Sequence, residues 1–111
     1  MFARLKESAS ATVTLRRTGQ SDTTGVKAAV GSSQAISEDA GQTVVDSRSV
    51  DFLIAVADYA FAGSATEPVI NDVIVKGGVS YEVLPFAGEP PWRFTDEHNR
   101  TTYRVHTMQK S

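Results

Sequence analysis

Alternating apolar and polar residues predict short β-strands along much of this chain. Between residues 11 and 17, Val13 and Leu15 alternate with Thr12, Thr14 and Arg16. Successive side chains of a strand point to opposite faces, so the two apolar residues share one face. Residues 48–57 alternate in the same way around Phe52 and Ile54, which favours a strand. Phe52 to Tyr59 can also be read as a helix, because its large apolar residues recur at helical spacing.

The clearest pattern runs from Val69 to Pro85. Two apolar segments flank Lys76-Gly77-Gly78, and two adjacent glycines provide the positive φ angles that a tight hairpin turn requires. In the second segment Val79, Tyr81 and Val83 share one face. This stretch therefore predicts a β-hairpin.

Two further strands are predicted, over residues 42–47 and over Thr101 to Met108, which we expect to be an edge strand. Residues 59–68 and 86–99 contain Gly and Pro and are predicted to be irregular. The fold class is therefore mainly β: a small barrel or sandwich of six to seven strands with little helix.

A polar stretch, residues 18–39, has few large apolar residues and many Ser, Gly, Thr and Ala. This composition is typical of a flexible loop, although Val26 to Ile36 could also hold one or two short strands. Residues 1–10 are expected to form an N-terminal arm. The whole chain, residues 1–111, suits a single β-barrel domain.

Composition narrows the function classes. The chain has 111 residues, a net charge of −2 and no cysteine. Cysteine-based zinc sites and thiolate catalysis are thereby excluded. No basic cluster suggests a nucleic-acid face, and no apolar run approaches the ~20 residues that span a bilayer. We expect a protein without membrane contact in a reducing cytoplasm.

Residues with catalytic or metal-binding chemistry are sparse. The only histidines are His98, in a predicted loop, and His106, in a predicted strand; we expect one to be exposed and the other half-buried. The carboxylate pairs Glu38-Asp39 and Asp96-Glu97 lie in polar surroundings. We therefore predict no catalytic residues, no cofactor, no metal and no enzymatic activity.

The segment Glu89-Pro-Pro-Trp-Arg-Phe is unusual. Two prolines fix the backbone and hold the preceding residues extended, so the segment can present Trp92, Arg93 and Phe94. Trp and Arg are favoured anchors of protein interfaces. Alternatively, Trp92 folds back over the open end of the barrel; the two interpretations are compatible.

From Arg48 onward the order of features resembles the head-tail joining, or stopper, proteins of long-tailed bacteriophages. The matching elements are the strand Val50-Asp-Phe-Leu-Ile-Ala-Val-Ala-Asp58, a Gly/Pro loop, then Asn71-Asp72-Val73-Ile74 and Gly78-Val-Ser-Tyr-Glu-Val-Leu. The family commonly has Gly-Asp where this chain has Asn71-Asp72, so Asp72 is the position that carries over.

The resemblance implies a structural protein of a phage or prophage neck. Such a protein closes the DNA-filled head below the portal or its adaptor and offers a docking surface to the tail. It is a monomer when isolated and forms a ring on assembly, in the host bacterial cytoplasm and then in the virion neck. The expected contacts are Trp92, Arg93 and Phe94, Asp72, and the loop around Gly25, Lys27 and Glu38, with packaged DNA nearby.

Two alternatives remain open at this point. A small β-barrel with clustered aromatics could bind single-stranded nucleic acid or a small ligand. A tail-terminator or tail-tube protein of the same particle would share the fold class.

Overall fold

The computed structural model describes residues 10–39 and 42–110, and most of them lie in β-strands. The elements are β1 (Ser10–Arg16), β2 (Thr23–Asp39), β3 (Gln42–Ala55), the 3-10 helix η1 (Val56–Asp58), β4 (Ala60–Phe61), β5 (Ser64–Ala65), β6 (Val73–Lys76), β7 (Val79–Val83), β8 (Trp92–Phe94) and β9 (Thr102–Gln109).

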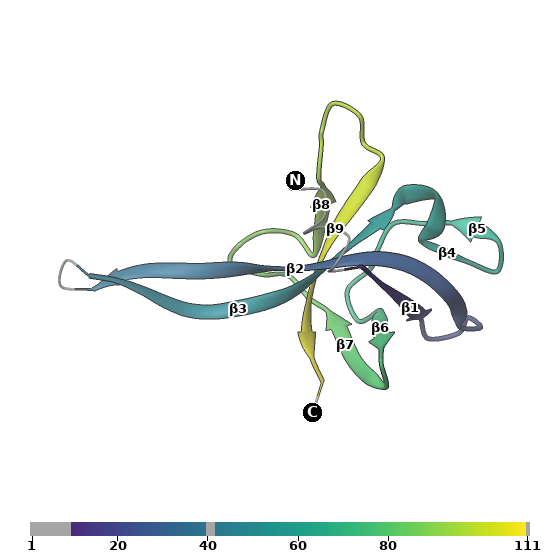
Figure 1. The fold of residues 1–111 in the computed structure, drawn as a ribbon, viewed down its shortest axis with the longest axis horizontal. Coiled ribbons are helices and arrows are strands. Elements are labelled where there is room, and N and C mark those ends of the chain that lie inside the picture. The colour runs from purple at the N-terminus through teal and green to yellow at the C-terminus, as the bar shows by residue number, and fades with distance from the viewer. Residues whose placement is uncertain (1–9, 40–41, 111) are drawn as a thin grey trace.

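Within the described residues, six strands close into an antiparallel barrel (Figure 1). Their order is β3-β2-β1-β6-β7-β9, and β9 pairs with β3 to complete the ring. The short strand β8 adds to β9 outside this ring. The mainly β prediction of six to seven strands is confirmed, and the barrel, rather than the sandwich, is observed.

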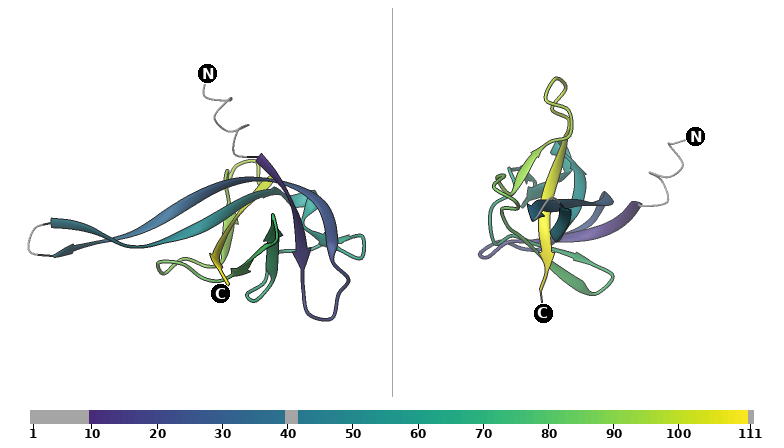
Figure 2. Two further views of the ribbon diagram at one scale, coloured as in Figure 1. Left: turned by 60° about the horizontal axis from the view of Figure 1, so that its bottom comes forward. Right: turned by 90° about the vertical axis from the view of Figure 1, so that its left-hand side faces the viewer.

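A two-stranded arm projects from the barrel. β2 pairs with β1 only over Thr23 to Ala29, and β3 pairs with β9 only over Val50 to Ala55. Between these points and the tip, residues 33–39 and 42–49 pair only with each other among the described strands. We call these two segments the arm. It extends away from the barrel in Figure 1 and in the left-hand view of Figure 2.

The arm corrects one prediction. Residues 18–39 were expected to form a loop, whereas Thr23–Asp39 is a single long strand. Its backbone is fixed by register with β3, from Ala29 opposite Leu53 to Asp39 opposite Gln42. Only residues 18–22 connect strands as expected. Whether this region moves stays a prediction.

The core lies inside the barrel and is built by the alternation seen in the sequence. Val13 and Leu15 of β1, Phe52 and Ile54 of β3, and Ile74 of β6 are buried. The rest of the cluster is contributed by other strands and loops: Val26, Ala28, Tyr59, Phe61, Val83, Tyr103 and Val105. Burial of these side chains is the main force holding the barrel closed.

The ambiguous stretch from Phe52 to Tyr59 resolves into strand followed by a turn. β3 continues to Ala55 and the 3-10 helix follows, while the Tyr59 ring is fully buried. The predicted loop over residues 59–68 contains the small hairpin of β4 and β5.

Three two-residue turns share one backbone conformation. Ala62-Gly63, Gly77-Gly78 and Ala87-Gly88 all have positive φ at both positions. This is the type I′ geometry, whose twist matches that of hairpin strands. The predicted turn at Gly77-Gly78 is confirmed, whereas Ala62 and Ala87 occupy a conformation that alanine disfavours.

The last strand differs from expectation in its place. β9 was predicted to be an edge strand, but it pairs with β3 on one side and with β7 and β8 on the other. The edge position belongs to β8, which lies in the segment 86–99 predicted to be irregular. Val69 to Asp72 is a turn rather than the start of the hairpin strand.

Candidate functional site

β8 presents an aromatic cluster at one end of the barrel. The Trp92 ring meets Phe94 and Tyr103 edge-on, at centroid distances of 5.2 and 4.8 Å. Phe94 stacks on Tyr103 at 5.6 Å. Trp92 and Phe94 are half-buried against the core. Trp92 therefore does fold back onto the barrel, while part of its ring stays accessible. We call Trp92, Phe94 and Tyr103 the aromatic cluster.

Arg93 points away from this cluster. Cross-strand partners share a face, and Arg93 lies opposite Arg104 while its neighbours lie opposite Val105 and Tyr103. The Arg93 side chain is 48% exposed, and its Nε is 3.7 Å from Glu89 Oε1. This exposed, weakly paired guanidinium beside accessible aromatic surface suits a protein contact.

Gly25 and Lys27 lie on the part of β2 that forms the barrel wall, and both are exposed. The register of β1 with β2 shifts between Val13 and Leu15, and Gly25 has a φ of 73° at this bulge. A glycine supplies that conformation without a steric penalty. Lys27 is exposed and lies opposite Thr12. Glu38 lies far from both, near the tip of the arm, opposite Thr43.

Asp72 is a buried anchor. It is 2% exposed, and its carboxylate accepts two hydrogen bonds of 2.8 Å from Nε and Nη2 of Arg17. The Tyr59 hydroxyl donates at 2.8 Å and the Val69 amide at 3.0 Å. The side chain thus offers almost no surface to a partner, and Asp72 is a structural anchor rather than a contact residue.

The Asp72 network fastens the β4–β5 region to the barrel. Arg17 also donates to the Thr66 hydroxyl and to the Glu67 carbonyl, and its guanidinium lies 4.6 Å from the centre of the Phe61 ring. Hydrogen bonding to Asp72 raises the pKa of Arg17. Burial, reinforced by the Asp72 charge, raises the pKa of Tyr59 well above its ordinary value, so this hydroxyl stays protonated as a donor.

A second buried network lies at the root of the arm. Asp51 is fully buried on β3, with Arg104 Nε 2.7 Å from Oδ2 and His106 Nδ1 3.0 Å from Oδ1. The Ser49 hydroxyl donates to Asp51 Oδ1. On its other side His106 Nε2 is 2.9 Å from Glu89 Oε1. Strand β3, strand β9 and the segment before β8 are joined through these contacts.

Sequence reasoning missed this second network. His106 was expected to be half-buried, but it is 1% exposed, because residues around Phe86 and Glu89 cover the outer face of β9. A signal was present: Asp51 interrupts an apolar run, and Arg104 and His106 share one face two residues apart. His98 lies in an exposed loop as predicted.

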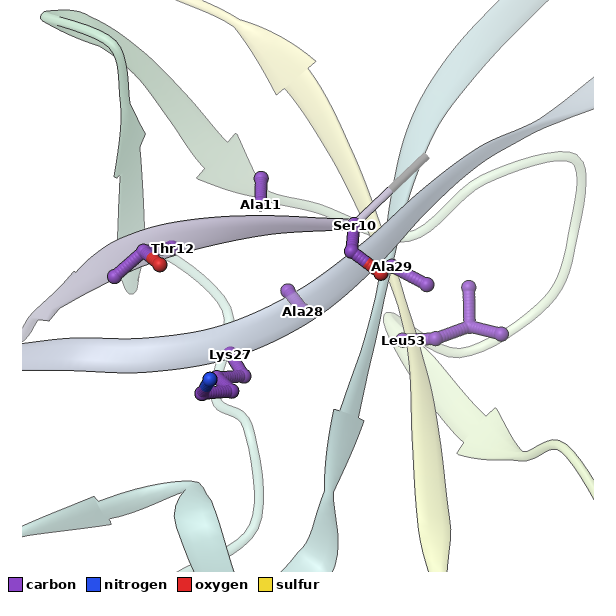
Figure 3. A pocket seen from close by; sticks show the side chains of 7 residues that line it. All are labelled: Ser10, Ala11, Thr12, Lys27, Ala28, Ala29 and Leu53. Carbon is purple, nitrogen blue, oxygen red and sulfur yellow. The ribbon is translucent and has the colours of Figure 1, made fainter. Parts of the chain in front are cut away.

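Several open hollows lie on the surface of the described residues. A hollow of about 420 Å³ lies where β1, β2 and β3 meet (Figure 3). Its lining is mostly small: Ser10, Ala11, Thr12, Lys27, Ala28, Ala29 and Leu53. Across the described ranges, no group of three or more metal-binding side chains is found, and no helix there is long and apolar enough to cross a membrane.

Comparison with known proteins decides the family. A family model described as phage head-tail joining protein matches residues 2–111. The chain belongs to the phage head-tail joining protein family. Searches of curated proteins and of solved structures gave no match. The resemblance seen in the sequence is thus confirmed and extends over almost the whole chain.

Membership in this family defines a structural role. Head-tail joining proteins are structural components of bacteriophages that connect head and tail, which implies a place in the virion neck and contact with head and tail proteins. The β-barrel described above is therefore the scaffold of a head-tail connector.

Proposed function

We propose that this protein closes the DNA-filled head below the portal or its adaptor and gives the tail a docking surface, without enzymatic activity. The observation that carries this proposal is the family match over residues 2–111 combined with a closed barrel that projects a long arm. A closed barrel leaves few strand edges for association. Partner contacts would then fall on the arm and on β8.

The arm suits assembly into a ring. A pair of strands without a third strand beside it is marginally stable by itself. The eight arm residues of β3, 42–49, give the arm a length of roughly 26 Å at about 3.3 Å per residue. A neighbouring copy that packs against the arm would supply the missing interface. We propose that the isolated protein is a monomer in the host cytoplasm and that copies associate on the assembling neck, where new interface area offsets the entropy of ordering.

The proposed contact residues fall into two groups. Trp92, Arg93 and Phe94 form the first, at the barrel end, where half-buried aromatic rings and an exposed arginine resemble the anchors of protein interfaces. The second group lies on β2, with Gly25 and Lys27 in the barrel wall and Glu38 near the tip of the arm. A ring built this way would surround packaged DNA, and the net charge of −2 suits a channel that does not bind it.

A shortened arm tests this proposal. The variant replaces residues 35–47 with Asn-Gly, a favoured two-residue hairpin turn. Every strand pair of the barrel stays intact, because the pairs of β2 with β1 and of β3 with β9 lie outside the deletion. We expect a monomer with an unchanged barrel spectrum that fails to rescue a phage lacking this gene.

The control exchanges Gly77-Gly78 for Asn-Gly, which keeps the same turn type in a hairpin away from the arm. This control is expected to restore infectious particles. Full infectivity of the shortened-arm variant would contradict the proposal that the arm makes essential contacts in the neck.

A further inference from the structure

His106 lies between two carboxylates from different parts of the fold. The ring is 1% exposed, and Phe86 packs against it at a centroid distance of 5.7 Å. Nδ1 is 3.0 Å from Oδ1 of Asp51, on β3. Nε2 is 2.9 Å from Oε1 of Glu89, in the segment that leads into β8. Both ring nitrogens therefore face carboxylate oxygens at hydrogen-bond distance.

Counting donors shows which form of the ring can bond to both carboxylates. An ionised carboxylate only accepts hydrogen bonds, and a neutral imidazole has one N–H donor. A neutral ring can therefore satisfy Asp51 or Glu89, but not both. A doubly protonated ring donates to both at once, and it places a positive charge between two negative ones. Asp51 is also held by Arg104 and Ser49, which suits an ionised acceptor.

We propose that His106 is a proton-binding site: it is held as an imidazolium between Asp51 and Glu89, and its second proton fastens the segment Phe86–Pro91 to the barrel. Among the described side chains, four charged groups lie around the ring or its partners. Asp51 lies on β3, Glu89 on the covering segment, Arg104 on β9 beside Asp51, and Arg93 on β8 at 3.7 Å from Glu89.

Loss of the proton breaks the hydrogen bond between His106 Nε2 and Glu89 Oε1. Asp51 is fully buried and depends on internal donors, whereas the Glu89 side chain is 50% exposed and can be hydrated instead. The segment then keeps its backbone contacts, including the 2.8 Å hydrogen bond from the His106 amide to the Pro91 carbonyl. Because Pro91 leads directly into β8, proton binding is linked to the position of the aromatic cluster.

Ring-nitrogen NMR of the ¹⁵N-labelled full-length protein tests the proposal. At about pH 7.5, where an ordinary histidine is neutral, both nitrogens of His106 are expected to show the protonated signature. His98, exposed in the same molecule, provides the comparison signal. A single protonated nitrogen on His106 at this pH overturns the proposal, because one of the two carboxylates would then hold the proton itself or accept no hydrogen bond from the ring.

Two variants separate the Glu89 contact from general effects. Glu89→Gln supplies an amide that can donate to a neutral ring, so only one protonated nitrogen is expected at the same pH. Glu97→Gln removes a carboxylate whose partner is Arg100, and it is expected to match the wild type. On raising the pH further, the Ala87 and Gly88 amide signals should move in the wild type and stay fixed in Glu89→Gln. Identical behaviour of Glu89→Gln and wild type would also overturn the proposal.

Discussion

The Asp72 carboxylate allows a quantitative test of how the barrel is held together. Asp72→Asn keeps the size of the side chain and one acceptor oxygen, so Tyr59 and the Val69 amide can retain a partner. The change removes the charge that the Arg17 guanidinium contacts at 2.8 Å from two of its nitrogens. Arg17 is left beside a neutral group in a partly buried site.

The expected cost follows from burial. Removing one member of a buried ion pair costs roughly 3–5 kcal/mol. Asp72 is 2% exposed, but the Arg17 side chain is 21% exposed and keeps its contact with the Glu67 carbonyl. We therefore expect the lower end, about 3 kcal/mol. With a urea m-value of roughly 1.5 kcal/mol/M, the unfolding midpoint falls by about 2 M.

Urea unfolding followed by circular dichroism measures this shift, and the chain offers a matched control. The neighbouring pair Arg16–Asp22 has side chains that are 52% and 40% exposed, so Asp22→Asn should leave the midpoint unchanged within error. Arg17→Met reports on the same buried pair from its other side, in case Asp72→Asn does not fold. Equal midpoints for Asp72→Asn and Asp22→Asn would refute the reasoning.

Two further predictions follow from the same structure. Burial raises the pKa of Tyr59 in the folded protein. Its contribution to the free energy of unfolding is therefore fully present below the ordinary pKa of about 10, and it is lost as the pH rises above that value, because only the unfolded chain then loses the proton. Urea midpoints should therefore fall less steeply between about pH 9 and pH 11 in Tyr59→Phe than in wild type; equal slopes would contradict this. Ala62 has a φ of 53° before Gly63, so Ala62→Asn should add roughly 0.5–1 kcal/mol and raise the Tm by several degrees. Ala65→Asn, in the adjacent strand, should give no such gain, and an equal rise in both variants would contradict the assignment to backbone strain.

The strands that the sequence predicted correctly are those with a local signal. Val13 and Leu15, or Tyr81 and Val83, alternate with polar residues because one face of each strand packs on the core. Gly77-Gly78 identified its turn because few other residues adopt positive φ. These features depend on residues within a few positions of each other, so a single sequence is enough to find them.

The features that were missed depend on distant pairing. β2 has the composition of a loop, and it becomes a strand through its register with β3. The side chains of this segment do not reveal the strand, because its pairing is made by backbone hydrogen bonds, which every residue except proline can donate. Residues 1–9 of the predicted N-terminal arm lie outside the described part of the chain.

The candidate site was predicted only in part. Trp92, Arg93 and Phe94 could be identified because Pro90-Pro91 marks them and interface anchors have a recognisable composition. Asp72 was found through a family motif, yet its burial was not foreseen, because the partner Arg17 is 55 residues away in sequence. Asp51 and His106 come together by the same kind of long-range pairing.

The most direct test of the central claim is a cryo-electron microscopy map of the neck of the phage particle that carries this protein. The account predicts a ring of these barrels between the portal or its adaptor and the tail, with each arm against a neighbouring copy and the β8 end against a head or tail protein. Density for the barrel along the tail tube, or its absence from the neck of complete particles, would contradict the proposed role.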